Sequence, residues 1–226
     1  MSIEKIKEIR TQLRLAMNGV ASTSMREKGI AYKMNFGVSL PKLKEIALTH
    51  QKEAVLAEAL WKEDVRELKI LATLLYPFDA FTAERAECWV RQVGQQEIAE
   101  QYCMNLLQHV ALPCSFEMAV GWIKEREEEF VQVVGFLWLS RLLATKGEGL
   151  SAACRDVLFR TARETMDNGI SRIQRAAVIA LKQYGRQSTQ QAALALAVVE
   201  DYQQSDSPIR KEFYNDLKFE FEYYHN

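Results

Sequence analysis

Five segments of this chain begin with a similar polar-then-apolar phrase, and they recur at nearly constant spacing. With one apolar marker from each segment, the steps are 33, 33, 42 and 36 residues, the markers being Val65, Ile98, Val131, Ile173 and Ile209. A period of this length with two helices per step is typical of α-solenoids of the HEAT or armadillo kind. Each helix pair in such an array leaves an apolar face that only its neighbours cover, and the second helices line one concave wall. The spacing therefore predicts an all-α superhelix, with an ordinary helical bundle as the alternative.

The composition favours helices along the whole chain. Only four prolines and ten glycines interrupt stretches rich in Ala, Leu, Glu, Lys and Gln, which are good helix formers, and no segment shows the sustained period-two alternation of a strand. One helix is expected to start near Ser39, a suitable N-cap, with Pro41 in its first turn. Further helices are expected around 53–62, 65–76, 81–93, 96–110, 114–125, 129–145, 150–167, 171–185, 189–202 and 207–224. The longest step contains an expected loop at 145–149, and we expect one HEAT-like repeat domain over residues 1–226.

The charge is balanced overall but uneven along the chain. A net charge of −1 and a pI near 6.4 disfavour a general nucleic-acid binder, which is usually basic. Residues 1–44, however, carry nine basic side chains against three acidic ones, and residues 150–186 carry seven against three. Acidic residues gather at 125–129 and again after Glu200. A basic patch on a neutral protein is therefore compatible with the sequence.

Several classes of site and location are disfavoured. The four cysteines lie in apolar helical patterns without a CxxC pair, so buried free thiols are expected, and three scattered histidines complete no metal site. No cofactor is expected. The strongest apolar run, 130–144, is too short to span a bilayer, which needs about 20 residues. The N-terminus predicts a charged amphipathic helix instead of a signal peptide, so we expect a cytoplasmic protein.

Three segments resemble a known family. The first is 35–47, Asn-Phe-Gly-Val-Ser-Leu-Pro-Lys-Leu-Lys-Glu-Ile-Ala, and it is similar to the N-terminal signature of the AlkC/AlkD family of DNA alkylation repair proteins. Residues 60–72 resemble the leucine–tryptophan, acidic, leucine–alanine segment that follows there, and 173–184 resemble a late helix of the same family. The resemblance covers most of the chain and implies HEAT-like helical repeats.

The resemblance also implies an activity. AlkD-type members excise positively charged N3- and N7-alkylated purines, gripping the duplex in a concave basic cleft with a carboxylate, aromatic side chains and an arginine near the deoxyribose. Position by position, the aspartate falls on Asn105 and its neighbouring tryptophan on Gln101. The cleft arginine falls on Val133 and the second tryptophan on Ile179. The resemblance therefore implies that all four functional positions are replaced.

The remaining candidates concern relocated chemistry and binding. Glu100, Tyr102 and Glu117 are candidates to line the same wall, the alternative being solvated carboxylates and a packing tyrosine. Two helices supply candidate DNA-binding cations, which are Lys42, Lys44, Arg172, Arg175, Lys182 and Arg186. The alternative for these is a solvated helix face.

Two functions compete at this point. The first is recognition of alkylated or distorted duplex DNA with altered or absent glycosylase chemistry. The second is a non-catalytic HEAT-repeat scaffold that binds other proteins. The aromatic C-terminus, 213–224, either caps the last repeat or forms a contact between copies of the chain.

Overall fold

The protein is all-α in the computed structural model, which describes residues 2–146 and 150–225. The β-type pairing within these ranges is one isolated bridge between Met34 and Val65. The all-α prediction is therefore confirmed, while residues 147–149 of the expected loop lie outside the described residues. In the same ranges no helix combines the length and apolar character that crossing a membrane requires.

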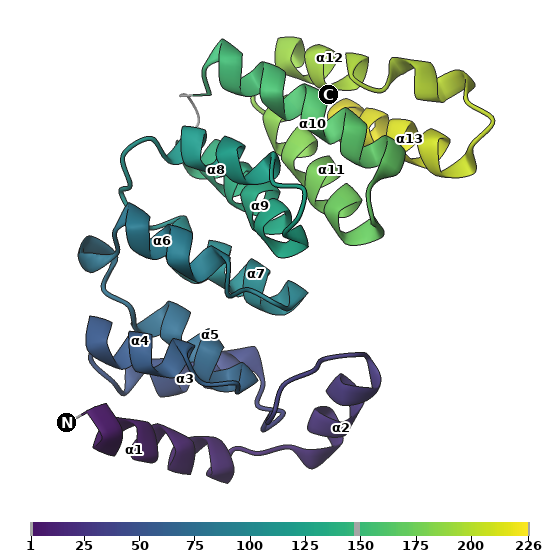
Figure 1. Ribbon diagram of the computed structural model, residues 1–226. Helices are drawn as coiled ribbons and strands as arrows, with labels where there is room; N and C mark the ends of the chain where they lie inside the picture. The colour runs from purple at the N-terminus through teal and green to yellow at the C-terminus, as the bar shows by residue number, and fades with distance from the viewer. Residues whose placement is uncertain (1, 147–149, 226) are drawn as a thin grey trace. The chain divides into compact units, whose positions relative to one another are not determined.

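The chain divides into two compact units (Figure 1). Unit 1 comprises Met1–Trp89 and Glu100–Ala111, and unit 2 comprises Val90–Ala99 and Leu112–Asn226. The first half of the chain contains α1 (Ser2–Leu15), α2 (Gly19–Glu27), α3 (Leu40–Leu48), α4 (Ala54–Trp61), α5 (Arg66–Leu75), the 3-10 turn η1 (Phe78–Ala80), α6 (Ala83–Val90), α7 (Gln96–Tyr102) and the π-helical turn η2 (Cys103–Leu107). The second half contains α8 (Ser115–Ile123), α9 (Glu129–Lys146), α10 (Ala152–Asn168), α11 (Ser171–Gly185), α12 (Thr189–Ala197), the 3-10 turn η3 (Glu200–Gln204) and α13 (Pro208–His225). The prediction of a single domain stays a prediction.

An aromatic cluster forms much of the core of unit 1. Trp61 at the end of α4 stacks on Trp89, with ring centroids 4.2 Å apart and planes within 3°. Tyr76 and Phe81 meet Trp89 edge to face, and Tyr102 leans against both indoles. Aromatic pairs in such geometries contribute about 0.5–1.5 kcal/mol beyond their buried area. The cluster therefore packs α4 against Trp89 and Tyr102 within unit 1.

A buried ion pair fixes the segment that leads into α3. Arg66 and Glu67 open α5 and are both buried, with 2.9 Å between Nη1 and Oε1. The Glu67 carboxylate accepts the backbone N–H groups of Phe36 and Val38, and Arg66 donates to the carbonyl of Val38. Between these two residues Gly37 has φ +67°, a conformation that favours glycine. The segment 36–38 is thus held against α5 by charge-assisted hydrogen bonds.

In unit 2, α9 packs against α8 on one side and α11 on the other (Figure 1). All residues from 131 to 140 are buried, so the middle of this helix exposes almost no surface. Gly135 allows α8 to come close, because a Cβ at this position would lie 2.7 Å from the backbone nitrogen of Ile123. Beside it, Trp122 and Trp138 pack with ring centroids 4.9 Å apart. The buried side of α11 therefore packs against this largely enclosed helix.

An ion-pair network joins α10, η3 and α13. Arg163 contacts Asp167 at 2.9 Å and Asp201 at 2.5 Å, and Arg210 contacts Asp167 at 2.8 Å. The Tyr202 hydroxyl donates to Asp167 at 2.7 Å. Burial raises the pKa of Asp167, but the hydrogen bonds from Tyr202 and Arg163 outweigh it, so the net pKa is lowered. The hydrogen bond from Arg163 lowers the pKa of Asp201.

One expectation about the cysteines needs correction. Cys103 and Cys154 are buried, whereas Cys88 and Cys114 are exposed. Cys88 lies on the exposed side of α6, although the residues that follow it in this helix are apolar and buried. Cys114 is the N-cap residue of α8, at φ 54°, and so lies outside the helical pattern. The expectation of buried thiols is therefore wrong for Cys88 and Cys114.

Candidate functional site

The exposed side of α11 carries the densest group of the predicted cations. The opposite side of this helix is buried through Ile173, Ala176, Ala177, Ala180, Leu181 and Tyr184. Because 3.6 residues make one turn, Arg172, Arg175 and Lys182 share one side of the helix, and the C-cap residue Arg186 continues the same line. We call Arg172, Arg175, Lys182 and Arg186 the α11 basic face.

A pocket of about 420 Å³ lies between this face and α13. We call it the α11–α13 groove, and its lining residues are Ser171, Gln174, Arg175, Val178, Ile179, Lys182, Ile209, Glu212, Phe213 and Asp216. The lining combines apolar side chains with charges of opposite sign: Arg175 and Lys182 come from α11, and Glu212 and Asp216 come from α13. The groove lies wholly within unit 2.

Three of the four basic side chains already hold an acidic partner. Lys182 Nζ lies 2.6 Å from an Asp216 carboxylate oxygen and 3.5 Å from one of Glu220. Arg186 lies 2.5 Å from Glu220, and Arg172 lies 2.7 Å from Glu129.

Arg175 is the exception. Among the described residues no acidic side chain pairs with Arg175, which is exposed. The sequence predicted the cations but missed the acidic partners on α13. Their spacing of four residues on a helix was the signal that marks them as one side of α13.

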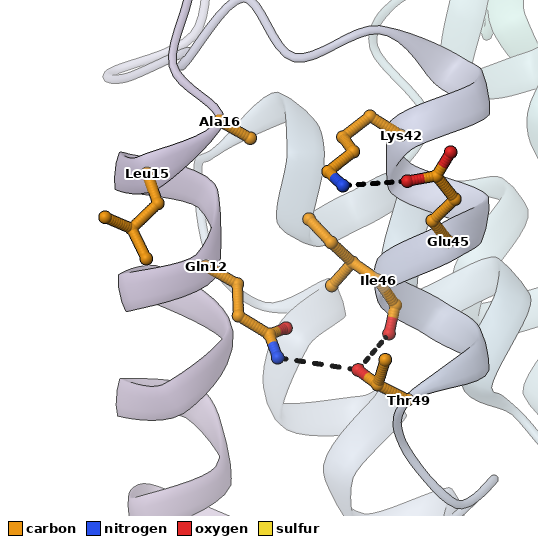
Figure 2. A pocket seen from close by; sticks show the side chains of 7 residues that line it. All are labelled: Gln12, Leu15, Ala16, Lys42, Glu45, Ile46 and Thr49. Carbon is orange, nitrogen blue, oxygen red and sulfur yellow. Dashed lines mark hydrogen bonds and ion pairs between the residues drawn. The ribbon is translucent and has the colours of Figure 1, made fainter.

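A second pocket contains the candidate Lys42. Figure 2 shows this pocket, about 460 Å³, between α1 and α3, with lining residues Gln12, Leu15, Ala16, Lys42, Glu45, Ile46 and Thr49. Lys42 Nζ pairs with Glu45 at 2.7 Å, one turn further along the same helix. Thr49 accepts from the Gln12 amide at 3.4 Å, which links the two helices across the pocket. Lys44 on the same helix is exposed. The pocket therefore has an apolar floor and a neutralised cation.

The position to which the resemblance assigns the family aspartate, Asn105, lies in a neutral hydrogen-bond network of unit 1. Asn105 sits in the π-helical turn η2 and donates its amide to Gln101 Oε1 at 3.1 Å and to Thr73 Oγ1 at 3.0 Å. Thr73 is buried and donates its own hydroxyl to the carbonyl of Ile70. Gln101 is also buried. The site is thus occupied by paired amides and a hydroxyl, with no charge among these groups.

The other two family positions lie in unit 2 and have different surroundings. Val133 is completely buried in the middle of α9, so it presents no group to a ligand surface. Ile179 is 45% exposed and lines the α11–α13 groove beside Arg175 and Lys182. The structure thus brings Ile179 together with the predicted cations of α11.

The three groove-lining candidates differ in their exposure. Glu100 and Glu117 are both exposed. Tyr102 is fully buried in the aromatic cluster, its hydroxyl donates to the carbonyl of Ala86, and burial raises its pKa well above the ordinary value. Tyr102 is therefore the packing tyrosine of the alternative and does not line a groove, because its ring fills the space beside Trp61 and Trp89. No group of three or more His, Cys, Asp or Glu in residues 2–146 and 150–225 is arranged to hold a metal ion.

Comparisons with known proteins show the family and the fold. A family model described as DNA alkylation repair enzyme matches residues 9–212. One solved structure, from a new family of proteins related to the HEAT-like repeat DNA glycosylases with affinity for branched DNA structures, is similar with a TM-score of 0.76. The identity is 14%, and the match covers 94% of this chain and 94% of the other, so this likeness shows a HEAT-like repeat helical fold. A comparison with curated proteins gives no match. Because the family model spans most of its length, this chain belongs to the DNA alkylation repair enzyme family.

Proposed function

We propose that this protein binds DNA through the α11 basic face and does not perform the base excision of its family. The observation that carries the proposal is the alignment of four cations on one rigid helix within one unit. From Arg172 to Arg186 the helix rises about 21 Å, since each residue adds about 1.5 Å. One strand of B-DNA places a phosphate every 3.4 Å or so along the axis, so this length matches about six phosphates.

The fold and family support this choice of ligand. Family membership makes DNA the first macromolecule to consider, and the similar solved structure belongs to proteins with affinity for branched DNA. Contacts between helix side chains and phosphates read no base sequence. We therefore expect binding that depends on DNA shape and phosphate density, with branched DNA as the preferred probe beside a linear duplex.

The proposed lack of excision follows from charge. Cleavage of the glycosidic bond develops positive charge on the deoxyribose, and a carboxylate about 4 Å away stabilises it by about 4 kcal/mol at an effective dielectric near 20. Loss of that energy slows the step about a thousandfold. The Asn105 amide supplies no such charge and is committed to Gln101 and Thr73. Val133 is buried and brings no cation in place of the arginine.

The direct test is fluorescence anisotropy with a labelled four-way junction and a linear duplex of the same length, at about 50 and 200 mM salt. Each phosphate that a cation neutralises adds about 0.9 to the slope of log K against log salt, so Arg172→Ala/Arg175→Ala is expected to weaken binding and to flatten the slope by about 1.8. Arg160→Ala is the matched control, because it removes an exposed cation from α10, a helix that does not line the groove. Absence of binding to either DNA at low salt would overturn the proposal.

The chemistry needs its own assay. Release of 7-methylguanine and 3-methyladenine from methylated DNA is expected to stay at the level of the protein-free reaction over hours. A time-dependent release that scales with protein concentration, and that is lost in Asn105→Ala, would contradict the proposed lack of excision and place the chemistry at this turn.

A protein-interaction scaffold is the second candidate function. Two observations favour it. Ile179 and Ile209 line the α11–α13 groove and are both exposed, and α13 also carries the exposed aromatic pair Phe219 and Tyr223. Apolar surface of this kind is common where a peptide or another copy of the chain docks. A protein that fails to bind DNA but changes its sedimentation with concentration, and loses that change in Phe219→Ser/Tyr223→Ser, would favour this alternative.

A further inference from the structure

One side of α13 carries three carboxylates that face the α11 basic face. Glu212, Asp216 and Glu220 are spaced by four residues, which places them on one side of the helix. We call them the acidic stripe. Glu212 and Asp216 line the α11–α13 groove, and Glu220 lies one turn beyond. We propose that the acidic stripe is an intramolecular competitor of DNA phosphates and sets the affinity of the α11 basic face; this rests on the proposed DNA binding.

Two residues of the acidic stripe form ion pairs with cations of the α11 basic face. Asp216 holds Lys182 at 2.6 Å. Glu220 reaches both Lys182, at 3.5 Å, and Arg186, which it meets through Nε at 2.7 Å. The Glu220 side chain is only 17% exposed, so its charge acts in a less polar setting than that of a fully solvated carboxylate. These carboxylate oxygens therefore occupy the places that phosphate oxygens would take.

The charges in this part of unit 2 cancel. Arg175, Lys182 and Arg186 bring three positive charges to one side, and the three carboxylates of the acidic stripe bring three negative charges to the other. A neutral groove does not attract a polyanion over a distance, so electrostatic steering of DNA toward it is weak. Every phosphate contact with Lys182 or Arg186 is then an exchange in which a carboxylate is displaced.

Arg175 is the member of the α11 basic face at which a phosphate displaces no carboxylate. It is the one member of the α11 basic face to which no described acidic side chain is paired, so a phosphate meets it without displacing a partner. Initial contact is therefore expected at Arg175, and engagement of Lys182 and Arg186 follows only when enough phosphates lie nearby. The acidic stripe acts in this way as an affinity-setting element of the interface.

The variant Asp216→Asn/Glu220→Gln tests the proposal, because it keeps the shape of both side chains and removes two negative charges. Exposed ion pairs contribute little each, so the expected gain in affinity for the four-way junction at about 50 mM salt is threefold to tenfold. The gain is expected mainly in the association rate and to shrink at 200 mM salt. The slope of log K against log salt is expected to steepen by up to about 1.8 as two cations become available.

Two controls keep the reading specific. Glu164→Gln removes one negative charge from α10, where Glu164 pairs with Arg126, and is expected to leave the affinity unchanged. Arg175→Ala is expected to weaken binding of both the wild type and the Asp216→Asn/Glu220→Gln variant. Circular dichroism and thermal unfolding confirm that each variant is folded before its binding is compared.

The outcomes separate the two proposals. Wild-type binding with no gain in Asp216→Asn/Glu220→Gln, or an equal gain in Glu164→Gln, overturns the acidic stripe and leaves DNA binding in place. Binding by the variant alone overturns DNA binding as the function of the wild type, while it supports the acidic stripe as a competitor of phosphates. Failure of the wild type and of the variant to bind any DNA at low salt overturns the proposed function, and the stripe with it.

Discussion

The buried carboxylate of Glu67 offers a stability test whose size follows from the structure. Glu67 Oε2 accepts the N–H of Phe36 at 3.0 Å, and Oε1 accepts from Val38 N–H at 3.3 Å and from Arg66 Nη1 at 2.9 Å. Glu67 is 0% exposed and Arg66 2% exposed, so water replaces none of these contacts. The substitution Glu67→Gln keeps the shape, removes the charge and directs an amide N–H at another donor.

The expected cost is large. Removal of one partner of a buried pair leaves the other charge uncompensated and typically costs 3–5 kcal/mol. The free energy of unfolding of a protein of ordinary stability is about 5–15 kcal/mol, so Glu67→Gln is expected to remove a fifth or more of it. The double variant Arg66→Met/Glu67→Gln is expected to lose less unfolding free energy than the two single variants lose together, because no buried charge remains.

Urea unfolding followed by circular dichroism measures both values from the midpoint and the slope. Glu63→Gln is the matched control: Glu63 pairs with Arg10 at 2.8 Å on the surface, and its loss is expected to change the free energy of unfolding by less than about 1 kcal/mol. If Glu67→Gln changes the unfolding free energy no more than Glu63→Gln does, the reasoning about the buried pair is refuted.

Three further predictions concern packing, the candidate site and pH. Gly135→Ala places a Cβ 2.7 Å from the backbone of α8 and is expected to lower the free energy of unfolding by about 1–3 kcal/mol. In Gly121→Ala the new Cβ meets nothing within 4 Å, so this variant is expected to gain about 0.5–1 kcal/mol. Thermal unfolding of the two variants tests the difference. Asn105→Asp sets a carboxylate beside Gln101 Oε1 and Thr73 Oγ1 and is expected to cost about 1–2 kcal/mol at neutral pH. It is expected to release no methylated base, because Gln101 and the buried Val133 still supply neither an aromatic ring nor a cation; release above the protein-free level would contradict this. Because the pKa values of Asp167 and Asp201 are lowered in the folded protein, their stabilisation is fully present above the unfolded value near 3.8 and is lost as the pH falls through the folded values; urea midpoints from pH 6 to 2 are expected to fall less steeply in Asp201→Asn.

The repeat spacing and the helix-rich composition were sufficient to predict the all-α fold, because helix period and turn residues are local properties. The expected helix at 96–110 is present as α7 and the π-helical turn that follows it, and the expected helix at 189–202 is divided between α12 and a 3-10 turn. Local pattern gives no sign of these changes in hydrogen bonding. The exact paths of these helix ends depend on what packs against them.

The candidate site shows where sequence reasoning ends. The cations of α11 could be placed on one side of a helix from their spacing alone. Their pairing with Asp216 and Glu220 could not, because those carboxylates lie 34 residues along the chain and reach Lys182 and Arg186 only when α13 packs on α11. The spacing of residues around Tyr102 could not decide its burial either, because that burial depends on indoles from two other helices.

The distribution of the four indoles gives this protein a built-in optical reporter for each unit. Trp61 and Trp89 are stacked almost in parallel in unit 1, whereas Trp122 and Trp138 are inclined by 37° in unit 2. Indoles in close contact couple their electronic transitions, so we expect each pair to give its own near-ultraviolet dichroism signal, which is lost when the two rings separate. When one pair is replaced by phenylalanine, the remaining indole signal comes from the other pair alone. The unfolding of each unit can therefore be followed by the near-ultraviolet signal of its own indole pair, without any added label.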